Sequence, residues 1–274
     1  MIGGLGGSGT RLIAQCLREL DFFMGSDLNE SNDNLLFTLL FKRIEVLDQS
    51  DQQFQEFLEL FLQSMVGDKR FTRRQMDLLQ TLATSARGKL TTRWLRERVE
   101  ALRHGQASSG NGGLTHANWG WKEPSTHVVL DRLRGSIVKL KYIHVARNGL
   151  DMAFSANQSQ LRLWGKHFLH RDAEVDPQSS LRYWCAVHRR VLEIGQSMGA
   201  DFLFLNYDDF CTESEAGIKK LCDFLAVDDD DEAHNRLLQL ISPPASIGRF
   251  KLHDNSMFDE EDVGYVAQLG FRIA

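Results

Sequence analysis

The sequence predicts an α/β fold in which helices flank a parallel sheet, with an all-helical insertion at about residues 34–104. Short β-rich runs alternate along the chain with longer segments whose apolar residues recur at helical spacing, which is typical of parallel sheets. A Gly-rich run at residues 1–11 joins the first predicted strand to the first helix. The 274 residues suffice for one large core, so we expect a single domain over residues 1–274.

The predicted strands are apolar or β-rich runs that turn residues bound. Residues 139–146 are rich in strand-forming residues around Tyr142, Ile143 and Val145, and residues 201–206 contain the run Phe-Leu-Phe-Leu. Shorter strands are expected at residues 1–4, 22–24 and 119–122.

The predicted helices carry apolar residues three and four positions apart. In the insertion the clearest stripe is Phe54, Phe57, Leu58, Phe61, Leu62 and Met65, and a later helix contains Trp94, Leu95, Val99 and Leu102. Outside the insertion we expect helices at residues 9–20, from Ser125 or Thr126 through 133, and at 147–155, 177–198, 218–225 and about 259–269. Loops are expected at residues 26–34, with a helix cap at Asn32 or Asp33, and at 105–118, 228–232 and 242–251.

The composition is that of an ordinary soluble globular protein, with 42% hydrophobic and 25% charged residues. The net charge of −5 argues against broad nucleic-acid binding, so any anion site is expected to be local. The four cysteines have no metal-ligand spacing, and no metal site is predicted. We expect a cytoplasmic protein without a membrane span, because the start is Gly-rich and no apolar run reaches about 18 residues.

The Gly-rich run predicts an anion-binding loop. Gly3, Gly4, Gly6, Gly7 and Gly9 let the backbone take left-handed conformations and approach a ligand closely. The helix that follows aims its free N–H groups and the positive end of its dipole at the same point. Such an arrangement favours a phosphate group.

The run is close to the nucleotide-triphosphate loop G-x-x-x-x-G-K-[ST] but departs from it at two positions. Gly4 and Gly9 are correctly spaced, whereas Thr10 stands at the Lys position and Arg11 at that of the Mg²⁺-binding hydroxyl. This departure weakens an ATP–Mg²⁺ interpretation. A small-molecule or nucleoside-phosphate kinase with a degenerate P-loop stays open as an alternative, and so does a non-catalytic nucleotide-binding protein.

Four motifs together resemble those of the sulfotransferases that use 3′-phosphoadenosine 5′-phosphosulfate (PAPS). The run Gly7-Ser-Gly-Thr-Arg11 after a short strand resembles the family's 5′-phosphosulfate loop. The segment from Arg147 and Asn148 to Ser155 matches the family's R-N-x-x-D-x-x-x-S element. Residues 206–210, Asn-Tyr-Asp-Asp-Phe, are similar to its Y-E-D-[LF] segment, and residues 246–249, Ser-Ile-Gly-Arg, resemble its late G-R loop.

The resemblance implies a P-loop-like sulfotransferase fold. It also implies that a sulfuryl group moves in line, without a metal, from PAPS to a hydroxyl or amine of an acceptor, leaving adenosine 3′,5′-bisphosphate. Arg147 and Ser155 would hold the 3′-phosphate, and the late loop would close over the nucleotide. The donor-binding residues implied in this way are Gly6, Gly7, Ser8, Gly9, Thr10, Arg11, Arg147, Ser155, Tyr207, Gly248 and Arg249. The acceptor is expected to be a small molecule or a saccharide.

The loop lacks a cation that many relatives have. They carry Lys or Arg directly before Ser-Gly-Thr, where this chain has Gly7. Arg11 and Lys122 are the candidates to supply the missing catalytic charge. Lys122 begins a Lys-Glu-Pro run where the hormone and phenol enzymes of the family have Lys-Thr-His, so no His stands at their catalytic position.

A carboxylate is therefore the expected general base. The leading candidate is Glu30, in the polar loop after the first helix, followed by Asp33 and Asp27, with solvent exposure or helix capping as the alternative role. His116 is the best candidate outside that loop. His127 and His144 are expected to be structural. The alternative for Arg147 is a surface ion pair with Asp151.

Overall fold

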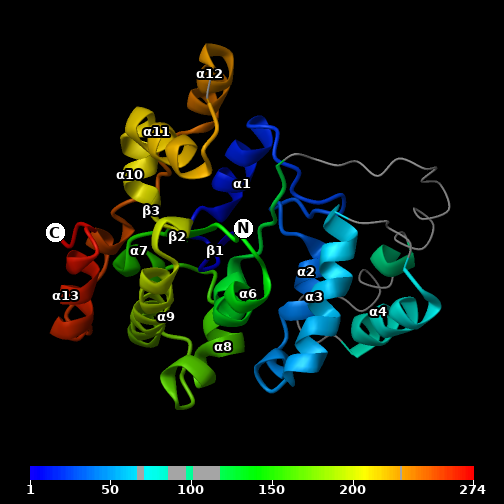
Figure 1. Cartoon of the computed structure of the whole chain (residues 1–274). Helices are drawn as coiled ribbons and strands as arrows, with labels where there is room; N and C mark the ends of the chain where they lie inside the picture. The colour runs from blue at the N-terminus through cyan, green and yellow to red at the C-terminus, as the bar shows by residue number, and fades with distance from the viewer. Residues whose placement is uncertain (67–70, 86–96, 101–117, 229) are drawn as a thin grey trace. The chain divides into compact units, whose positions relative to one another are not determined.

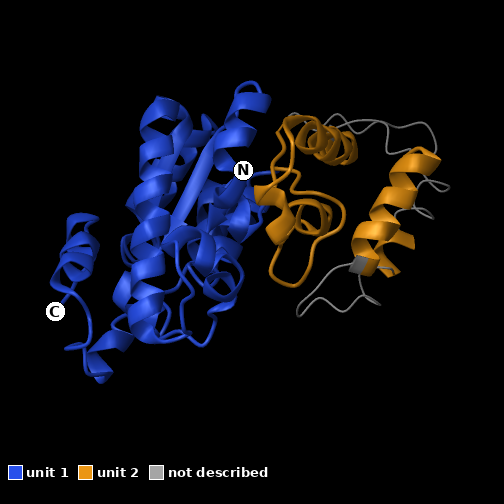
Figure 2. Ribbon diagram, turned by 90° about the horizontal axis from the view of Figure 1, so that it is seen from below, with its two compact units in different colours: residues 1–21, 122–274 blue, residues 22–121 orange. Residues whose placement is uncertain are grey.

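The computed structural model describes residues 1–66, 71–85, 97–100, 118–228 and 230–274. The chain divides into two compact units (Figure 2). The first unit contains Met1–Asp21 and Lys122–Ala274, and the second contains Phe22–Trp121. The insertion expected at residues 34–104 falls within the second unit.

The first unit contains a parallel sheet of three strands in the order β1-β2-β3. The strands are β1 (Ile2–Gly4), β2 (Tyr142–Ala146) and β3 (Phe202–Asn206). In the register, Gly3 lies beside His144 and His144 beside Phe204. All five residues of β2 are buried, as expected for a central strand with both faces covered. The predicted α/β class with a parallel sheet is confirmed.

Two of the predicted strands do not form. Residues 22–24 and 119–122 are joined by a single bridge between Phe23 and Trp119, and Lys122 makes an isolated parallel bridge with Ile2 of β1. The two ends of the 119–122 segment thus pair with different partners. Pro124 follows directly and begins a 3₁₀ helix, which ends the extended conformation.

Helices pack on the sheet of the first unit. The helix α9 (Pro177–Met198) contacts β2 and β3: the ring of His188 lies 5.0 Å from that of His144 between centroids. The helix α1 (Thr10–Glu19) packs beside α12 (Asp231–Leu240), where Arg236 Nε lies 3.4 Å from Glu19 Oε2. In Figure 1, α8 and α9 lie below the sheet, and α1 and α10–α12 lie above it.

The remaining described helices of this unit are short. They are the 3₁₀ helix Pro124–Val129, α6 (Leu130–Ser136), α7 (Gly149–Ala153), α8 (Ser159–Leu169), the 3₁₀ helix Gly199–Asp201, α10 (Tyr207–Thr212), α11 (Ser214–Leu225), the 3₁₀ helix Arg249–Leu252 and α13 (Glu260–Gln268).

The helix at Ser159–Leu169 was not predicted, and the loop expected at residues 228–232 is only partly correct. The side chain of Asp230 accepts a hydrogen bond from Ala233 N at 2.8 Å, and α12 begins at Asp231. The acidic residues are therefore an N-cap and a first helical turn. Negative charge is favourable there because it faces the positive end of the helix dipole.

The described part of the second unit consists of helices joined by loops and isolated bridges. Its helices are α2 (Leu35–Phe41), the 3₁₀ helix Ile44–Leu47, α3 (Asp51–Val66) and α4 (Arg73–Ser85). Phe37, Phe61 and Trp121 form an aromatic cluster with ring centroids 5.0–5.4 Å apart. The expected cap at Asn32 or Asp33 is wrong, because Asn34 accepts the hydrogen bond from Phe37 N at 3.0 Å. Residues 105–117 of the expected loop and most of the helix around Trp94 lie outside the described residues.

Candidate active site

The three strands of the first unit lead into three polar segments. The Gly-rich loop follows β1, Arg147 and Asn148 follow β2, and Tyr207 and Asp208 follow β3. Because the strands are parallel and adjacent, all three segments leave the sheet at its carboxyl edge. That edge is where open α/β sheets bind ligands.

The Gly-rich loop has the backbone of an anion site. Gly7 and Gly9 have φ angles of 97° and 98°, in the left-handed region that disfavours side chains. The helix α1 begins directly afterwards at Thr10, and no side chain of the described residues caps its N-terminus. The N–H groups in the first turn of a helix have no intrahelical acceptor, so these point toward the mouth of the loop.

Ser8 adds a polar side chain inside this loop. It is 1% exposed, and its Oγ has no hydrogen-bond partner among the residues that the structure describes. A side chain at Gly4 would come within 2.7 Å of the same oxygen, so the loop closes tightly around it. A buried hydroxyl without a partner is costly, and a bound phosphate oxygen would satisfy it.

Tyr207 lies against the loop from the end of β3. Any side chain at Gly9 would overlap its ring, so the packing of the two residues requires Gly9. Burial raises the pKa of the Tyr207 hydroxyl above its usual range, which keeps the hydroxyl protonated. Tyr207 thus forms a neutral aromatic wall beside the start of α1.

Ser155 reaches the loop from the segment after β2. A methyl group at Gly7 would lie 3.7 Å from Met152 Cε and 3.9 Å from Ser155 Oγ. The turn that carries Ser155 is fixed by Gln158, whose Nε2 donates to Met152 O and to Ser155 O, both at 2.9 Å. Two of the predicted donor-binding motifs are therefore neighbours.

Arg147 is 8% exposed at the end of β2. Its Nη2 donates to Ser246 Oγ at 2.7 Å, and its Nε lies 3.9 Å from Asp208 Oδ1. Its backbone carbonyl accepts from Trp184 Nε1 at 3.0 Å. The alternative of a surface ion pair with Asp151 does not describe this buried guanidinium.

Asp151 holds the late G-R loop. Its two carboxylate oxygens accept hydrogen bonds from Gly248 N at 2.8 Å and Phe250 N at 3.0 Å. The neighbouring Arg249 donates from Nη1 to Phe154 O at 3.4 Å, next to Ser155. This anchoring brings the predicted residues Gly248 and Arg249 to the 147–155 segment.

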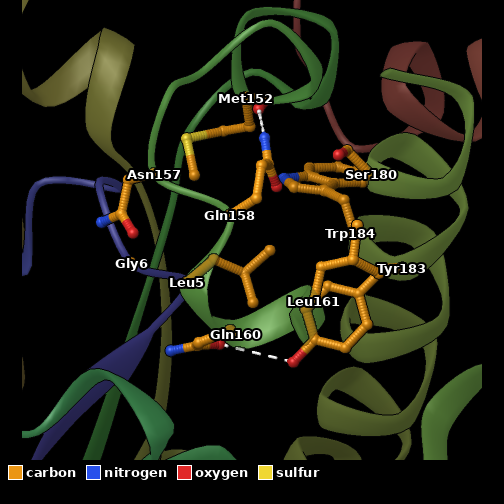
Figure 3. Close-up of a pocket in the computed structure, with 10 residues that line it drawn as sticks. All are labelled: Leu5, Gly6, Met152, Asn157, Gln158, Gln160, Leu161, Ser180, Tyr183 and Trp184. Atoms are coloured by element: carbon orange, nitrogen blue, oxygen red, sulfur yellow. Dashed lines mark hydrogen bonds between the residues drawn. The ribbon is translucent and has the colours of Figure 1, made fainter. Parts of the chain in front are cut away.

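A small pocket lies beside the start of the loop and is lined by Leu5 and Gly6 together with residues of the segments after β2 (Figure 3). Gln160, which lines it, donates from Nε2 to Gly4 O at 3.2 Å, and its Oε1 pairs with His127 Nε2 at 3.0 Å. His127 and His144 are fully buried, and burial lowers the pKa of both rings. His127 therefore supports the start of the loop from within the core, through Gln160.

The two candidate cations lie in different environments. Arg11 is exposed in the first turn of α1, next to the loop. Lys122 is 2% exposed and pairs with Ile2 of β1, so it is not a surface group.

The candidate bases lie in the second unit. Glu30 is exposed, and Asp33 Oδ2 accepts from Asn29 Nδ2 at 2.9 Å within the same turn. Asp27 Oδ1 lies 3.5 Å from Arg98 Nη1, and burial raises the pKa of the Asp27 carboxyl. His116 lies outside the described residues.

The partners that hold the predicted residues in place were not predicted from the sequence. Asp208, Ser246 and the anchoring role of Asp151 were not identified, although all three lie inside the recognised motifs. Their contacts join residues 60 to 99 positions apart, often through backbone N–H groups. Such contacts leave no spacing pattern in a sequence.

The described residues contain no group of three or more His, Cys, Asp or Glu side chains arranged to hold a metal ion. They also contain no helix that is both long and apolar enough to cross a membrane.

Comparisons with known proteins identify the family. A profile of the sulfotransferase family matches residues 1–231. Among solved structures, the sulfotransferase domain of the Synechococcus PCC 7002 olefin synthase is similar at 18% identity, with a TM-score of 0.54, over 100% of this chain and 94% of that one. The sulfotransferase domain of the curacin biosynthetic pathway is similar at 15% identity, with a TM-score of 0.50, over 100% and 98%.

No curated protein matches the chain in sequence. At these identities the two solved structures show a shared fold, whereas the profile covers most of the sequence. The chain therefore belongs to the sulfotransferase family.

Proposed function

We propose that the protein is a PAPS-dependent sulfotransferase that moves a sulfuryl group to a hydroxyl or amine of an acceptor. The observation that carries this proposal is the meeting of two anion-binding elements at one sheet edge. The loop with the buried, unpartnered Ser8 Oγ approaches Ser155 through Gly7, and Arg147 ends the adjacent strand. PAPS has anionic groups at both ends, and two such elements suit it.

The chain would bind the two ends of the donor separately. The backbone N–H groups of Gly6 to Arg11, with Ser8 Oγ, would hold the 5′-phosphosulfate. Arg147 and Ser155 would hold the 3′-phosphate, because a guanidinium and a hydroxyl form charge-assisted hydrogen bonds with phosphate. The late loop with Gly248 and Arg249 would cover the nucleotide beside Tyr207.

PAPS supplies the sulfuryl group, and the chain's residues would stabilise the charge that grows on the leaving phosphate. The amides of the loop are fixed before the reaction and need no reorganisation. This chain has Gly7 where many relatives have a cation, so the cation would come from elsewhere. We assign that role to Arg11 and Lys122, and the general base to Glu30. No metal enters this scheme.

The acceptor we propose is a small molecule or a saccharide, with no nucleic acid as partner. A cytoplasmic location agrees with the composition of the sequence. The second unit, which contains Glu30, is the part of the chain that we expect to shape the acceptor pocket.

The experiment that tests the function is calorimetric titration with adenosine 3′,5′-bisphosphate, 5′-AMP and ATP–Mg²⁺, followed by a turnover assay with PAPS. A sulfotransferase binds the bisphosphate more tightly than both other nucleotides and consumes PAPS when an acceptor is present. Preferred binding of ATP–Mg²⁺ would instead support a kinase. Tight binding of the bisphosphate without turnover on any acceptor would support a non-catalytic nucleotide-binding protein.

A further inference from the structure

Arg147 lies beside the carboxyl group of Asp208, a residue to which the resemblance assigns no role. Asp208 is the second residue of α10 and follows Tyr207. Its Oδ1 lies 3.9 Å from Arg147 Nε. Its other oxygen, Oδ2, accepts from Asn148 N at 3.1 Å, which fixes the carboxyl group in place. A negative charge therefore lies beside the side chain that would hold the 3′-phosphate.

The contact between these two groups is incomplete. Both Arg147 Nε and Asp208 Oδ1 are buried, and neither has a hydrogen-bond partner within the described parts of the chain. A structural ion pair would close to hydrogen-bond distance, since buried polar atoms without partners are costly. The two atoms are thus held near each other with their hydrogen-bonding capacity unused.

A 3′-phosphate bound to Arg147 would compete with this carboxylate. Two anions near one guanidinium repel each other strongly where water is scarce. Protonation of the carboxyl group removes that repulsion and turns Oδ1 from an unused acceptor into a possible donor to phosphate. Binding of the anion and binding of a proton would therefore favour each other.

We propose that Asp208 is the counter-charge that the donor's 3′-phosphate displaces from Arg147, and that its carboxylate takes up one proton from solvent when the nucleotide binds. This inference rests on the proposed function and extends it, because it makes Asp208 a positioning residue that tunes the affinity for the 3′-phosphate. The proton leaves a hydronium ion or a buffer acid, whose bond to it breaks, and forms an O–H bond on the carboxylate; no other bond of the protein or nucleotide changes.

The surroundings of Asp208 favour such an uptake near neutral pH. Burial raises the pKa of its carboxyl to about 6, against the opposing effects of the Asn148 N–H and Arg147. The nearby titratable groups besides Arg147 are Asp151 of α7 and, on α10, Tyr207, Asp209 and Cys211. Of these, Asp151 and Asp209 raise the pKa further. An added phosphate anion would act in the same direction.

The experiment is calorimetric titration of adenosine 3′,5′-bisphosphate into the wild type and Asp208→Asn at pH 6, pH 7 and pH 8, in buffers of different ionisation enthalpy. Asparagine keeps an acceptor for Asn148 N and removes the charge. The wild type is expected to take up roughly half a proton or more per nucleotide at pH 7, and Asp208→Asn clearly less. At pH 8 the variant should bind the bisphosphate roughly tenfold more tightly, because the repulsion is gone.

Two controls isolate the effect. With 5′-AMP, which lacks the 3′-phosphate, the wild type and Asp208→Asn should bind alike. Asp209→Asn removes a neighbouring charge that is exposed on the same helix, and it should keep the proton uptake of the wild type.

Equal proton uptake and an equal pH profile in the wild type and Asp208→Asn would overturn this inference while leaving the proposed function intact. If Asp208→Asn does not fold, the wild type is measured alone. An absence of proton uptake when it binds the bisphosphate would refute the proposed protonation of Asp208. Failure of the wild type to bind the bisphosphate at all would overturn the proposed function, and this inference with it.

Discussion

Arg147 lies almost buried at the end of β2, with its guanidinium between Ser246 and Asp208. We predict that Arg147→Ala weakens binding of adenosine 3′,5′-bisphosphate by roughly 2–3 kcal/mol, because a charge-assisted hydrogen bond in a largely buried site is lost. Calorimetry should also show that the preference for the bisphosphate over 5′-AMP collapses.

The matched control is Arg182→Ala on α9, which removes an arginine whose Nη2 pairs with Asp259 at 2.7 Å outside the site. That variant should bind both nucleotides as the wild type does. An unchanged preference in Arg147→Ala would contradict the assignment of the 3′-phosphate to this residue.

Glu30, the proposed general base, is exposed in the second unit. With an acceptor that supports turnover, we predict that Glu30→Gln lowers kcat by roughly 10²–10⁴-fold and leaves donor affinity unchanged, as expected for the loss of a general base. A rate close to that of the wild type would move the role to Asp33, Asp27 or His116, which the same assay on their amide or alanine variants would separate.

At the scale of elements, the conformation of the loop between β1 and α1 depends on glycine at two positions. Gly7 and Gly9 have nearly equal φ angles, but only Gly9 lies where a side chain overlaps the ring of Tyr207. We predict that Gly7→Ala costs about 1–2 kcal/mol of unfolding free energy from backbone strain alone, and that Gly9→Ala costs more. Denaturant unfolding of the two variants gives the comparison, and equal losses would refute the packing argument.

The buried histidines of β2, α9 and the 3₁₀ helix after Glu123 predict a pH dependence of stability. Burial lowers the pKa of His127 to about 3 and that of His188 to about 4, and it lowers that of His144 well below its usual range. The unfolded chain binds protons to these rings below about pH 6.5, whereas the folded chain does not. Their contribution to stability is therefore present above pH 6.5 and is lost as the pH falls toward the folded pKa values.

By pH 5 the loss amounts to about 2 kcal/mol for each of His127 and His188. The raised pKa of Asp208, about 6, acts in the opposite sense and offsets part of it. Denaturant unfolding at pH 7 and pH 5 of the wild type and His144→Gln isolates one ring, and the variant should lose less stability than the wild type over this interval. Equal losses would show that His144 is not held neutral in the folded state.

The elements that were predicted correctly are those whose secondary structure follows from the pattern of their own residues. β2 and β3 are compact runs rich in strand-forming residues, and α9 has a long amphipathic pattern that begins at a Pro after the cap Asp176. Residues 22–24 and 119–122 have similar composition, but they form isolated bridges because no strand lies along their length. Acidic residues at 228–232 read as a turn, although Asp230 and Asp231 begin a helix. Composition alone does not separate these cases.

At the scale of the whole molecule, the sequence motifs predicted which residues form the candidate site, and the fold shows which partners hold those residues in place. The Gly-rich run, Arg147 and Ser155 were visible because backbone conformation and charge depend on residue type. The partners that position them, Asp151 and Asp208, depend on which backbone N–H groups come to the same edge of the sheet. That placement follows from the order and register of the strands, which a single sequence does not specify.

A crystal structure of the protein with adenosine 3′,5′-bisphosphate would test the proposed donor site most directly. We predict the 5′-phosphate within hydrogen-bond distance of the N–H groups of Gly7 to Arg11 and of Ser8 Oγ, and the 3′-phosphate between Arg147 and Ser155. A nucleotide bound away from this edge, or bound with its 3′-phosphate in the Gly-rich loop, would contradict the proposed donor site.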